Sequence, residues 1–372
     1  MSSATRAIFC ILIFNFSLSS QLLHGQDKGW TFYDTLNRSL PSNFITKIVE
    51  AADGTMWVAQ GSNHISAYTP SGWKTFYCPN NVPWGHEYTN IRDIAFTSDH
   101  KLVLAGTVGW LMFFDPKKRE WDWKASPHGV QFLKIQCDSN DICLLGSMRG
   151  LYQYHNGTFT QLESDSTDVM GITLKGKDAW VGFRGGFYRY HLNNKMKYVQ
   201  RQRVSEWAIY ESAVLDKNDL WATSYSTLYL HHFNDTGQAQ FDSLPQSIYY
   251  DYNGQWRYVA HNIILDTLHN PIVSTQFGAH VAWLQNGQWK PYTVPIWMRD
   301  NVSFDGVASL AMRSDGSLWI GTWHHGIVVL SDVKSKYPKI KVTPKPAIQQ
   351  QNQQQPIPKK SPIVIPETWD AE

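Results

Sequence analysis

The chain repeats one pattern of polar and apolar positions seven times: a polar turn, a short apolar strand, a corner and a second strand. The pattern is clearest at residues 314–330, SDGSLWIGTWHHGIVVL, where Asp315-Gly316 precedes a strand carrying Trp319. Asp-Gly between apolar runs is typical of a hairpin, because glycine accepts the positive φ that such turns require. The earlier positions equivalent to Trp319 lie 37 to 51 residues apart and are Trp57, Val103, Cys143, Trp180, Trp221 and Ile272.

A period near 40–45 residues with about four strands per unit is typical of β-propeller blades. The sequence therefore predicts an all-β, seven-bladed β-propeller over residues 26–333, with strands A to D in each blade. The tryptophans of the repeat are expected to fill space between sheets. The seventh blade lacks a strand D after Leu330, and Gly29–Asp34 (GWTFYD) matches the strand D of the first blade at Gly72–Tyr77 (GWKTFY). We therefore expect the N-terminal strand to pair in the last blade and close the ring.

Both ends of the chain differ in composition from the repeats. Residues 1–25 hold one charge, Arg6, ahead of an apolar run at 7–16, which predicts a secretory signal peptide cleaved near residue 25 or after Ser19. A secreted or periplasmic location follows from this prediction. Residues 334–372 contain seven Pro and the run QQQNQQQ. Such a composition buries too little apolar surface to offset ordering entropy, so a disordered tail is expected.

Charge and cysteines narrow the classes of function. The net charge is +2, but the tail and signal are basic, so residues 26–333 hold 25 basic and 28 acidic residues, a net of −3. Binding to nucleic acid is disfavoured, because phosphate backbones require clustered Lys and Arg. Cys137 and Cys143 flank a turn between two strands, where they either form a disulfide or remain two small buried side chains. Cys78 is expected to be free and buried, and no zinc-ligand spacing is present.

The repeat LPSNFITKIVEAADGTMWVAQGSNHISAY at 40–68 resembles the two-component regulator propeller repeat, with its Asp-Gly, Trp and following Gly in place. The likeness is weaker in blades two, three and six, which lack the Trp. The resemblance implies the seven-bladed periplasmic sensor domains of hybrid histidine kinases, here as a free-standing propeller without a kinase. The repeat also resembles the propeller of streptogramin lyase, which is the enzymatic precedent.

Unusual chemistry gathers in the D–A and B–C connections, which share one end of a propeller, whereas the A–B turns are ordinary. Aromatic side chains suit sugars, peptides or planar ligands. Arg149 and Arg184 lie at equivalent corners of adjacent blades and suit a carboxylate or sulfate, or else each bridges to an Asp of a neighbouring blade. His324 and His325 are adjacent and expected to point oppositely, which disfavours a metal site. The candidate ligand-binding residues are Trp323, His324, His325, Arg184, Arg149, Tyr225, Trp110, Trp84, Trp207, Tyr250 and Trp297.

No catalytic motif stands out, since nucleophile elbow, phosphate-binding loop and HExxH pattern are all missing. We therefore predict no cofactor, no catalytic residue and no metal, and a non-enzymatic module that binds a glycan, peptide or protein. One alternative is a propeller-type lyase using His325 or His86 as base with Arg184 as electrophilic stabiliser. Another alternative is a scaffold protein of the cell envelope that uses the same loops.

Overall fold

The computed structural model describes residues 29–79, 90–107, 109–163, 168–193, 195, 197–205, 209–214, 220–224, 229–233, 239–243, 250–252, 255–257, 260–275, 280–295 and 305–331. The predicted signal peptide at 1–25 and the predicted tail at 334–372 lie outside these residues. Within them, no helix is long and apolar enough to cross a membrane.

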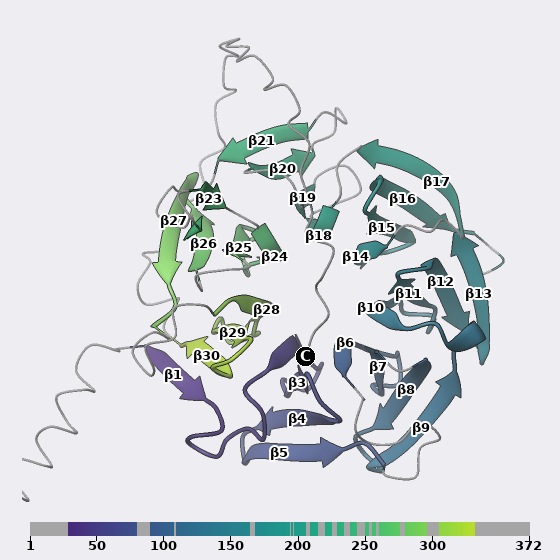
Figure 1. Ribbon diagram of the computed structural model, residues 1–372, viewed down its shortest axis with the longest axis horizontal. Helices are drawn as coiled ribbons and strands as arrows, with labels where there is room; N and C mark the ends of the chain where they lie inside the picture. Colours follow the sequence, from purple (N-terminus) through teal and green to yellow (C-terminus); the bar gives the residue numbers. More distant parts are fainter. Residues whose placement is uncertain are drawn as a thin grey trace, which may run out of the picture. The chain divides into compact units, whose positions relative to one another are not determined.

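Seven four-stranded antiparallel sheets follow one another around a ring, as the repeat predicted (Figure 1). The first three blades comprise β2 (Ile45–Glu50), β3 (Met56–Gln60), β4 (His64–Thr69), β5 (Gly72–Tyr77); β6 (Ile91–Phe96), β7 (Leu102–Gly106), β8 (Trp110–Asp115), β9 (Glu120–Ala125); and β10 (Phe132–Cys137), β11 (Cys143–Ser147), β12 (Gly150–His155), β13 (Thr158–Glu163).

Blades four to seven continue the same order. They comprise β14 (Val169–Lys175), β15 (Asp178–Phe183), β16 (Gly186–Leu192), β17 (Tyr198–Ser205); β18 (Ile209–Val214), β19 (Leu220–Ser224), β20 (Tyr229–Phe233), β21 (Ala239–Ser243); β24 (Ala260–Leu265), β25 (Pro271–Thr275), β26 (His280–Gln285), β27 (Gln288–Thr293); and β28 (Val307–Met312), β29 (Leu318–Thr322), β30 (Ile327–Leu330) with β1 (Trp30–Tyr33). A 3₁₀ turn, η1 (Pro127–Gly129), and a hairpin of β22 (Tyr250–Tyr252) and β23 (Gln255–Arg257) lie in D–A connections.

The N-terminal strand closes the ring, as the match between residues 29–34 and 72–77 predicted. Strand β1 pairs antiparallel with β30, with Trp30 opposite Leu330 and Tyr33 opposite Ile327. The Tyr33 ring lies 5.8 Å from the Trp319 ring and 5.2 Å from the Trp73 ring of the first blade. The first and last blades are therefore joined by a shared aromatic cluster as well as by a strand ladder.

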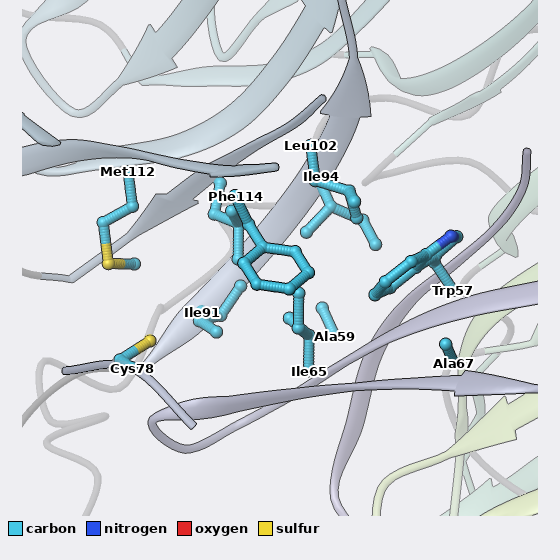
Figure 2. Packing of buried hydrophobic residues seen from close by; sticks show 11 residues of the cluster. Trp57, Ala59, Ile65, Ala67, Cys78, Ile91, Ile94, Leu102, Met112 and Phe114 are labelled. Atoms are coloured by element: carbon cyan, nitrogen blue, oxygen red, sulfur yellow. The ribbon is translucent and has the colours of Figure 1, made fainter. Parts of the chain in front are cut away.

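The repeat tryptophans are buried between blades, as expected. Trp57, Trp180, Trp221 and Trp319 are each no more than 6% exposed. Figure 2 shows one such interface, in which Trp57 and Ile65 of the first blade face Ile94 and Phe114 of the second. Cys78 is buried in the same cluster as a free thiol, and burial raises its pKa to about 12. Each hydrophobic cluster thus holds two neighbouring sheets together.

A β-bulge interrupts the pairing of the first and second strands at an equivalent place in all seven blades. The residue after the bulge often bonds to the next blade's inner strand. The Asp93 Oδ2 accepts from the Ile135 amide at 3.0 Å, and the Ser309 Oγ accepts from the Ile48 amide at 3.0 Å. The bulges therefore place polar side chains between the innermost strands, around the central channel.

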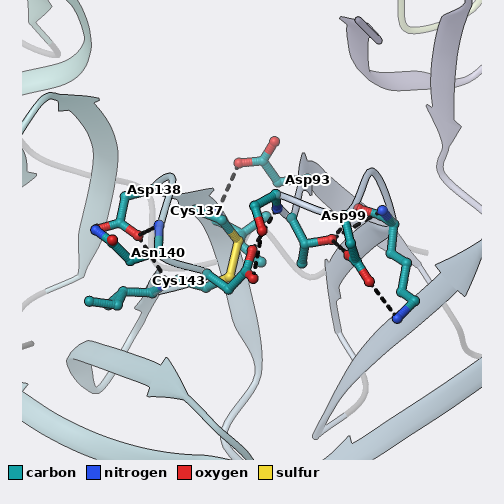
Figure 3. The surroundings of a disulfide bond; sticks show 12 residues. Asp93, Asp99, Cys137, Asp138, Asn140 and Cys143 are labelled. Carbon is teal, nitrogen blue, oxygen red and sulfur yellow. Dashed lines mark hydrogen bonds and ion pairs between the residues drawn. A yellow bond between two sulfur atoms is a disulfide. The ribbon is translucent and has the colours of Figure 1, made fainter.

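Cys137 and Cys143 form a disulfide across the hairpin of β10 and β11, where they are directly opposite each other (Figure 3). The turn between them is also held by Asp138, whose Oδ1 accepts from the amides of Asn140 at 2.9 Å and Ile142 at 3.0 Å. Asp141 in turn accepts from the Ser98 amide of the second blade. This end of the third blade is therefore tied both to itself and to its neighbour.

Replacing both Cys137 and Cys143 by Ser is expected to lower the free energy of unfolding by about 2 kcal/mol. The disulfide closes a loop of only a few residues, for which the chain-entropy model gives a stabilisation of that order. Because the unfolding entropy grows with chain length, the thermal unfolding midpoint of a ring of about 300 residues should move down by about 3 °C. Reductant should lower the thermal unfolding midpoint of the wild type by the same amount as the double substitution does. It should leave the midpoint of the double variant unchanged. A wild-type midpoint insensitive to reductant contradicts this account.

Candidate functional site

The D–A and B–C connections lie at one end of the propeller, which we call the loop-bearing end. Each innermost strand begins there and each second strand ends there, so the seven bulges lie close to this end. The disulfide and the other A–B turns belong to the opposite end. The bulged ends of the innermost strands therefore lie at the same end of the propeller as the B–C corners.

The corner of the seventh blade is organised by Asp305, a residue that the sequence did not single out. Its side chain is fully buried just before β28. The Asp305 Oδ1 accepts from the amides of Gly306 at 2.8 Å, Trp323 at 3.0 Å and His324 at 3.2 Å. The Oδ2 bonds to the Nδ1 of His325. One carboxylate thus fixes the whole Trp323–His325 corner to the preceding D–A connection.

The expected opposite orientation of the two histidines is wrong. The Nδ1 of His324 lies 3.3 Å from Asp305 Oδ1, and His325 bonds to the other oxygen of the same carboxylate. The backbone turns here instead of running extended, and Gly326 has φ +76°. The His324 side chain is 63% exposed, whereas that of His325 is 5% exposed. A small part of His325 is open to solvent, and its contact with Asp305 supports the corner.

The two arginines occupy different environments. The Arg184 Nη2 lies 2.7 Å from the Asp168 Oδ2, and the Arg184 amide donates to the Asp168 carbonyl at 3.1 Å. Asp168 precedes β14 of the same blade, so the bridge is within the blade and not to a neighbour. Arg149 is exposed, and its amide donates to the Ser147 Oγ at 3.0 Å. Blades four and seven therefore share one arrangement, in which an Asp of the D–A connection binds the B–C corner.

Of the other predicted residues, Trp110 begins β8 and is half-buried, as is Trp323. Tyr250 lies in β22, in the D–A connection, and its side chain is outside the described residues. Between blades four and five, β17 extends to Ser205 and β18 begins at Ile209. The other predicted residues lie outside the described residues; they are Tyr225, Trp84, Trp207, Trp297 and His86.

A cluster of charged side chains that the sequence did not reveal lies at the channel mouth. The channel-mouth cluster comprises Lys47, Lys134, Glu211 and His261, from the innermost strands of blades one, three, five and six. The Lys47 Nζ lies 3.4 Å from the Glu211 Oε1, so blades one and five, which are not neighbours, are bridged. The side chains of this pair are 20% and 18% exposed. The pair is therefore close to the interior yet still reached by water.

The members of the cluster change one another's protonation equilibria. Burial alone would lower the pKa of Lys47, but Glu211 and Asp93 outweigh it and raise this pKa. Burial alone would raise the pKa of Glu211, but Lys47, Lys134 and His261 lower it. Burial and the Lys134 charge lower the pKa of His261 to about 4. Lys47 and Glu211 are therefore an ion pair at neutral pH, and His261 is a neutral imidazole.

Replacing Asp305 by Ala is expected to destabilise the protein by about 3 kcal/mol. The change removes the acceptor of the Gly306 and His324 amides and of the buried His325 side chain, while the Trp323 amide keeps only a 3.3 Å bond to the Gly306 carbonyl. Buried unpaired donors are costly. Hydrogen exchange at residues 323–326 should rise more than exchange elsewhere in the described strands. Asp305→Asn, which keeps one side-chain oxygen as an acceptor, should lower the free energy of unfolding by less. Unchanged exchange at this corner in the Ala variant would contradict the assigned role.

Buried histidines predict that stability falls below pH 6.5. Burial lowers the pKa of His64 and of His231 to about 4, whereas an unfolded histidine titrates near 6.5. Between these values the unfolded state binds more protons, so the free energy of unfolding decreases as pH falls. By pH 5 each histidine should account for a loss of about 2 kcal/mol. Urea unfolding at pH 7.5 and at pH 5 measures this loss, and equal free energies of unfolding at the two pH values would refute it. In His231→Phe the free energy of unfolding should fall less between these pH values than in the wild type.

Comparisons with known proteins agree with this fold. The model of the family "Two component regulator propeller" matches residues 39–61, which span β2 and β3. A search of curated proteins finds no match. Among solved structures, a streptogramin B lyase has a TM-score of 0.63 and 16% identity over 81% of this chain and 96% of the other. The WD40 propeller domain of Doa1 has a TM-score of 0.59 and 11% identity, covering 80% and 95% of the two chains.

The solved structures that match also include an extracellular domain of a two-component system. The extracellular domain of a putative hybrid two-component system from B. thetaiotaomicron has a TM-score of 0.60 and 14% identity. The match covers 81% of this chain and 41% of that domain. At such identities the likeness shows the fold, while the match at residues 39–61 shows the repeat. The chain is a seven-bladed β-propeller that carries a match to the two-component regulator propeller repeat at residues 39–61.

Proposed function

We propose that the protein is an exported, non-enzymatic module that binds a glycan or peptide at its loop-bearing end. The observation that carries the proposal is the channel-mouth cluster, in which the partly exposed Lys47–Glu211 pair joins the inner strands of blades one and five, and Lys134 of blade three acts on Glu211. A rigid ring that carries connections and charges at one end is suited to ligand binding. The fold likeness to extracellular propellers of two-component systems supports export and a sensor-like role.

Glycan and peptide arrays test the binding proposal. The purified mature protein should bind a restricted set of glycans or peptides, and Trp323→Ala and Arg184→Ala should weaken that binding. Lys118→Ala is the matched control, because Lys118 lies in the C–D turn of the second blade at the opposite end. Binding that is insensitive to both loop-end variants, or lost equally in the control, overturns the proposed location. The export proposal predicts that N-terminal sequencing finds a start after Ser19 or near residue 26.

A lyase remains a second candidate because the fold likeness includes a streptogramin B lyase and because Asp305 holds His325 at the loop-bearing end. In this candidate His325 acts as the base and Arg184 stabilises the developing charge. Turnover of a streptogramin B that is lost in His325→Ala would favour the lyase. Failure to turn over this compound, together with array binding that His325→Ala retains, would favour the binding module.

A further inference from the structure

The carboxylates among the innermost strands already have partners. Asp93 accepts from the Ile94 amide through Oδ1 and from the Ile135 amide through Oδ2, both at 3.0 Å. Glu211 accepts from the Ile263 amide at 3.1 Å through Oε2 and from Lys47 through Oε1. Each oxygen of both groups therefore has a donor, and neither carboxylate needs a cation from a ligand.

The cations on the neighbouring strands are in the opposite situation. Lys47, Arg92 and Lys134 lie on the consecutive inner strands β2, β6 and β10, at or next to the bulges. Within the described part of the chain, Lys134 has no ion-pair partner within 4.0 Å, and its charge acts on Glu211 and His261. The Nε of Arg92 is buried without a hydrogen-bond partner there. The groups on these inner strands that still lack a partner are thus hydrogen-bond donors with positive charge.

We propose that Lys134, with Lys47 beside it, binds the carboxylate of a small acidic ligand that enters the channel mouth. The proposal rests on the proposed ligand-binding function and names the chemistry of the ligand. Glu211 already shows how a carboxylate is held at this level, by a backbone amide and the Lys47 ammonium. A metal cation is disfavoured by the two ammonium groups. A neutral sugar leaves the Lys134 charge without a counter-ion.

The pKa of His261 should respond to the binding of an anion at Lys134. Burial, and then the charges of Lys134 and Lys47, lower the pKa of its imidazole to about 4 against the opposing effect of Glu211. An anion bound to the lysines favours the protonated imidazole, so it must raise the pKa of His261. A ligand that stacks on loop aromatics without meeting the lysines has no such effect. Titration of His261 by NMR therefore separates binding at the cluster from binding elsewhere.

The test uses sodium D-glucuronate, sodium acetate and D-glucose with the mature protein. Glucuronate and acetate should raise the pKa of His261 by at least half a unit at saturation, and glucose should not. Lys134→Met should weaken glucuronate binding at least tenfold, the size expected for a charged hydrogen bond. Lys134→Arg should retain most of the affinity, and Lys118→Met should bind as the wild type does. Glucuronate affinity should also fall between 50 and 300 mM salt.

Different results separate this inference from the proposed function. Unchanged glucuronate affinity in Lys134→Met, or an equal shift with glucose, overturns the carboxylate site. If Lys134→Met does not fold, wild-type affinity for glucuronate that is independent of salt overturns it as well. A third result is that the protein binds neutral glycans on the arrays, that Trp323→Ala weakens this binding, and that glucuronate and acetate have no effect on His261. This result removes the carboxylate site and leaves the proposed binding function in place. Absence of binding on the arrays and in the titrations removes both.

Discussion

Deletion of residues 29–34 should destabilise the propeller by about 5 kcal/mol and cause it to associate. The deletion removes β1, whose Trp30, Phe32 and Tyr33 are partly buried against the last and first blades. Each such aromatic side chain contributes on the order of 1–2 kcal/mol, and the β30 ladder is lost in addition. The edge of β30 is then unpaired, and open strand edges promote association.

Thermal unfolding and size-exclusion chromatography measure both effects of this deletion. The control is Thr31→Ala, because Thr31 is exposed and its strand pairing remains. The control should unfold close to the wild-type temperature and elute as the wild type does. A deletion variant that elutes and unfolds like the wild type would contradict closure by the N-terminal strand.

Replacement of Glu211 by Gln should lower the free energy of unfolding by about 3 kcal/mol. Gln keeps an oxygen for the Ile263 amide but leaves the Lys47 ammonium without its carboxylate in a largely buried place. Breaking a buried pair from one side typically costs 3–5 kcal/mol, and the partial exposure of this pair places it at the lower end.

A matched exposed pair provides the control for this substitution. Lys101 and Asp99 are 2.6 Å apart, closer than Lys47 and Glu211, but their side chains are 41% and 53% exposed. Lys101→Met should therefore change stability by less than about 0.5 kcal/mol. Urea unfolding compares the two variants. Similar losses in both variants would mean that burial does not set the importance of the pair across the channel.

The fold was predictable because each blade repeats the same local pattern. Alternating apolar residues, a Trp slot and Asp-Gly turns each depend on neighbours within a few residues, so they are visible in the sequence. Closure was predictable for the same reason, since residues 29–34 resemble a strand D. Residues 200–205 of β17 and the β22–β23 hairpin lie in segments with weaker periodicity, which the repeat does not mark as strands.

The channel-mouth cluster was not predictable, because its members come from four repeats. Lys47 and Glu211 are 164 residues apart and each is an ordinary charged residue within its own strand. Their meeting depends on the number of blades and on bulges at the same place in each. Asp305 was missed for a related reason, since nothing near it in sequence marks a partner for His325. A ligand-binding role for Trp84, Trp207, Tyr225 and Trp297 stays a prediction.

The channel-mouth cluster forms only if the ring brings the inner strands of blades one and five together across the channel. A double-mutant cycle with Lys47→Met and Glu211→Gln measures this contact directly through urea unfolding. We predict a coupling free energy of about 1–2 kcal/mol, with the double variant more stable than the sum of the single losses implies. A coupling indistinguishable from zero would mean that Lys47 and Glu211 do not meet, and the arrangement of the channel mouth described above would be wrong.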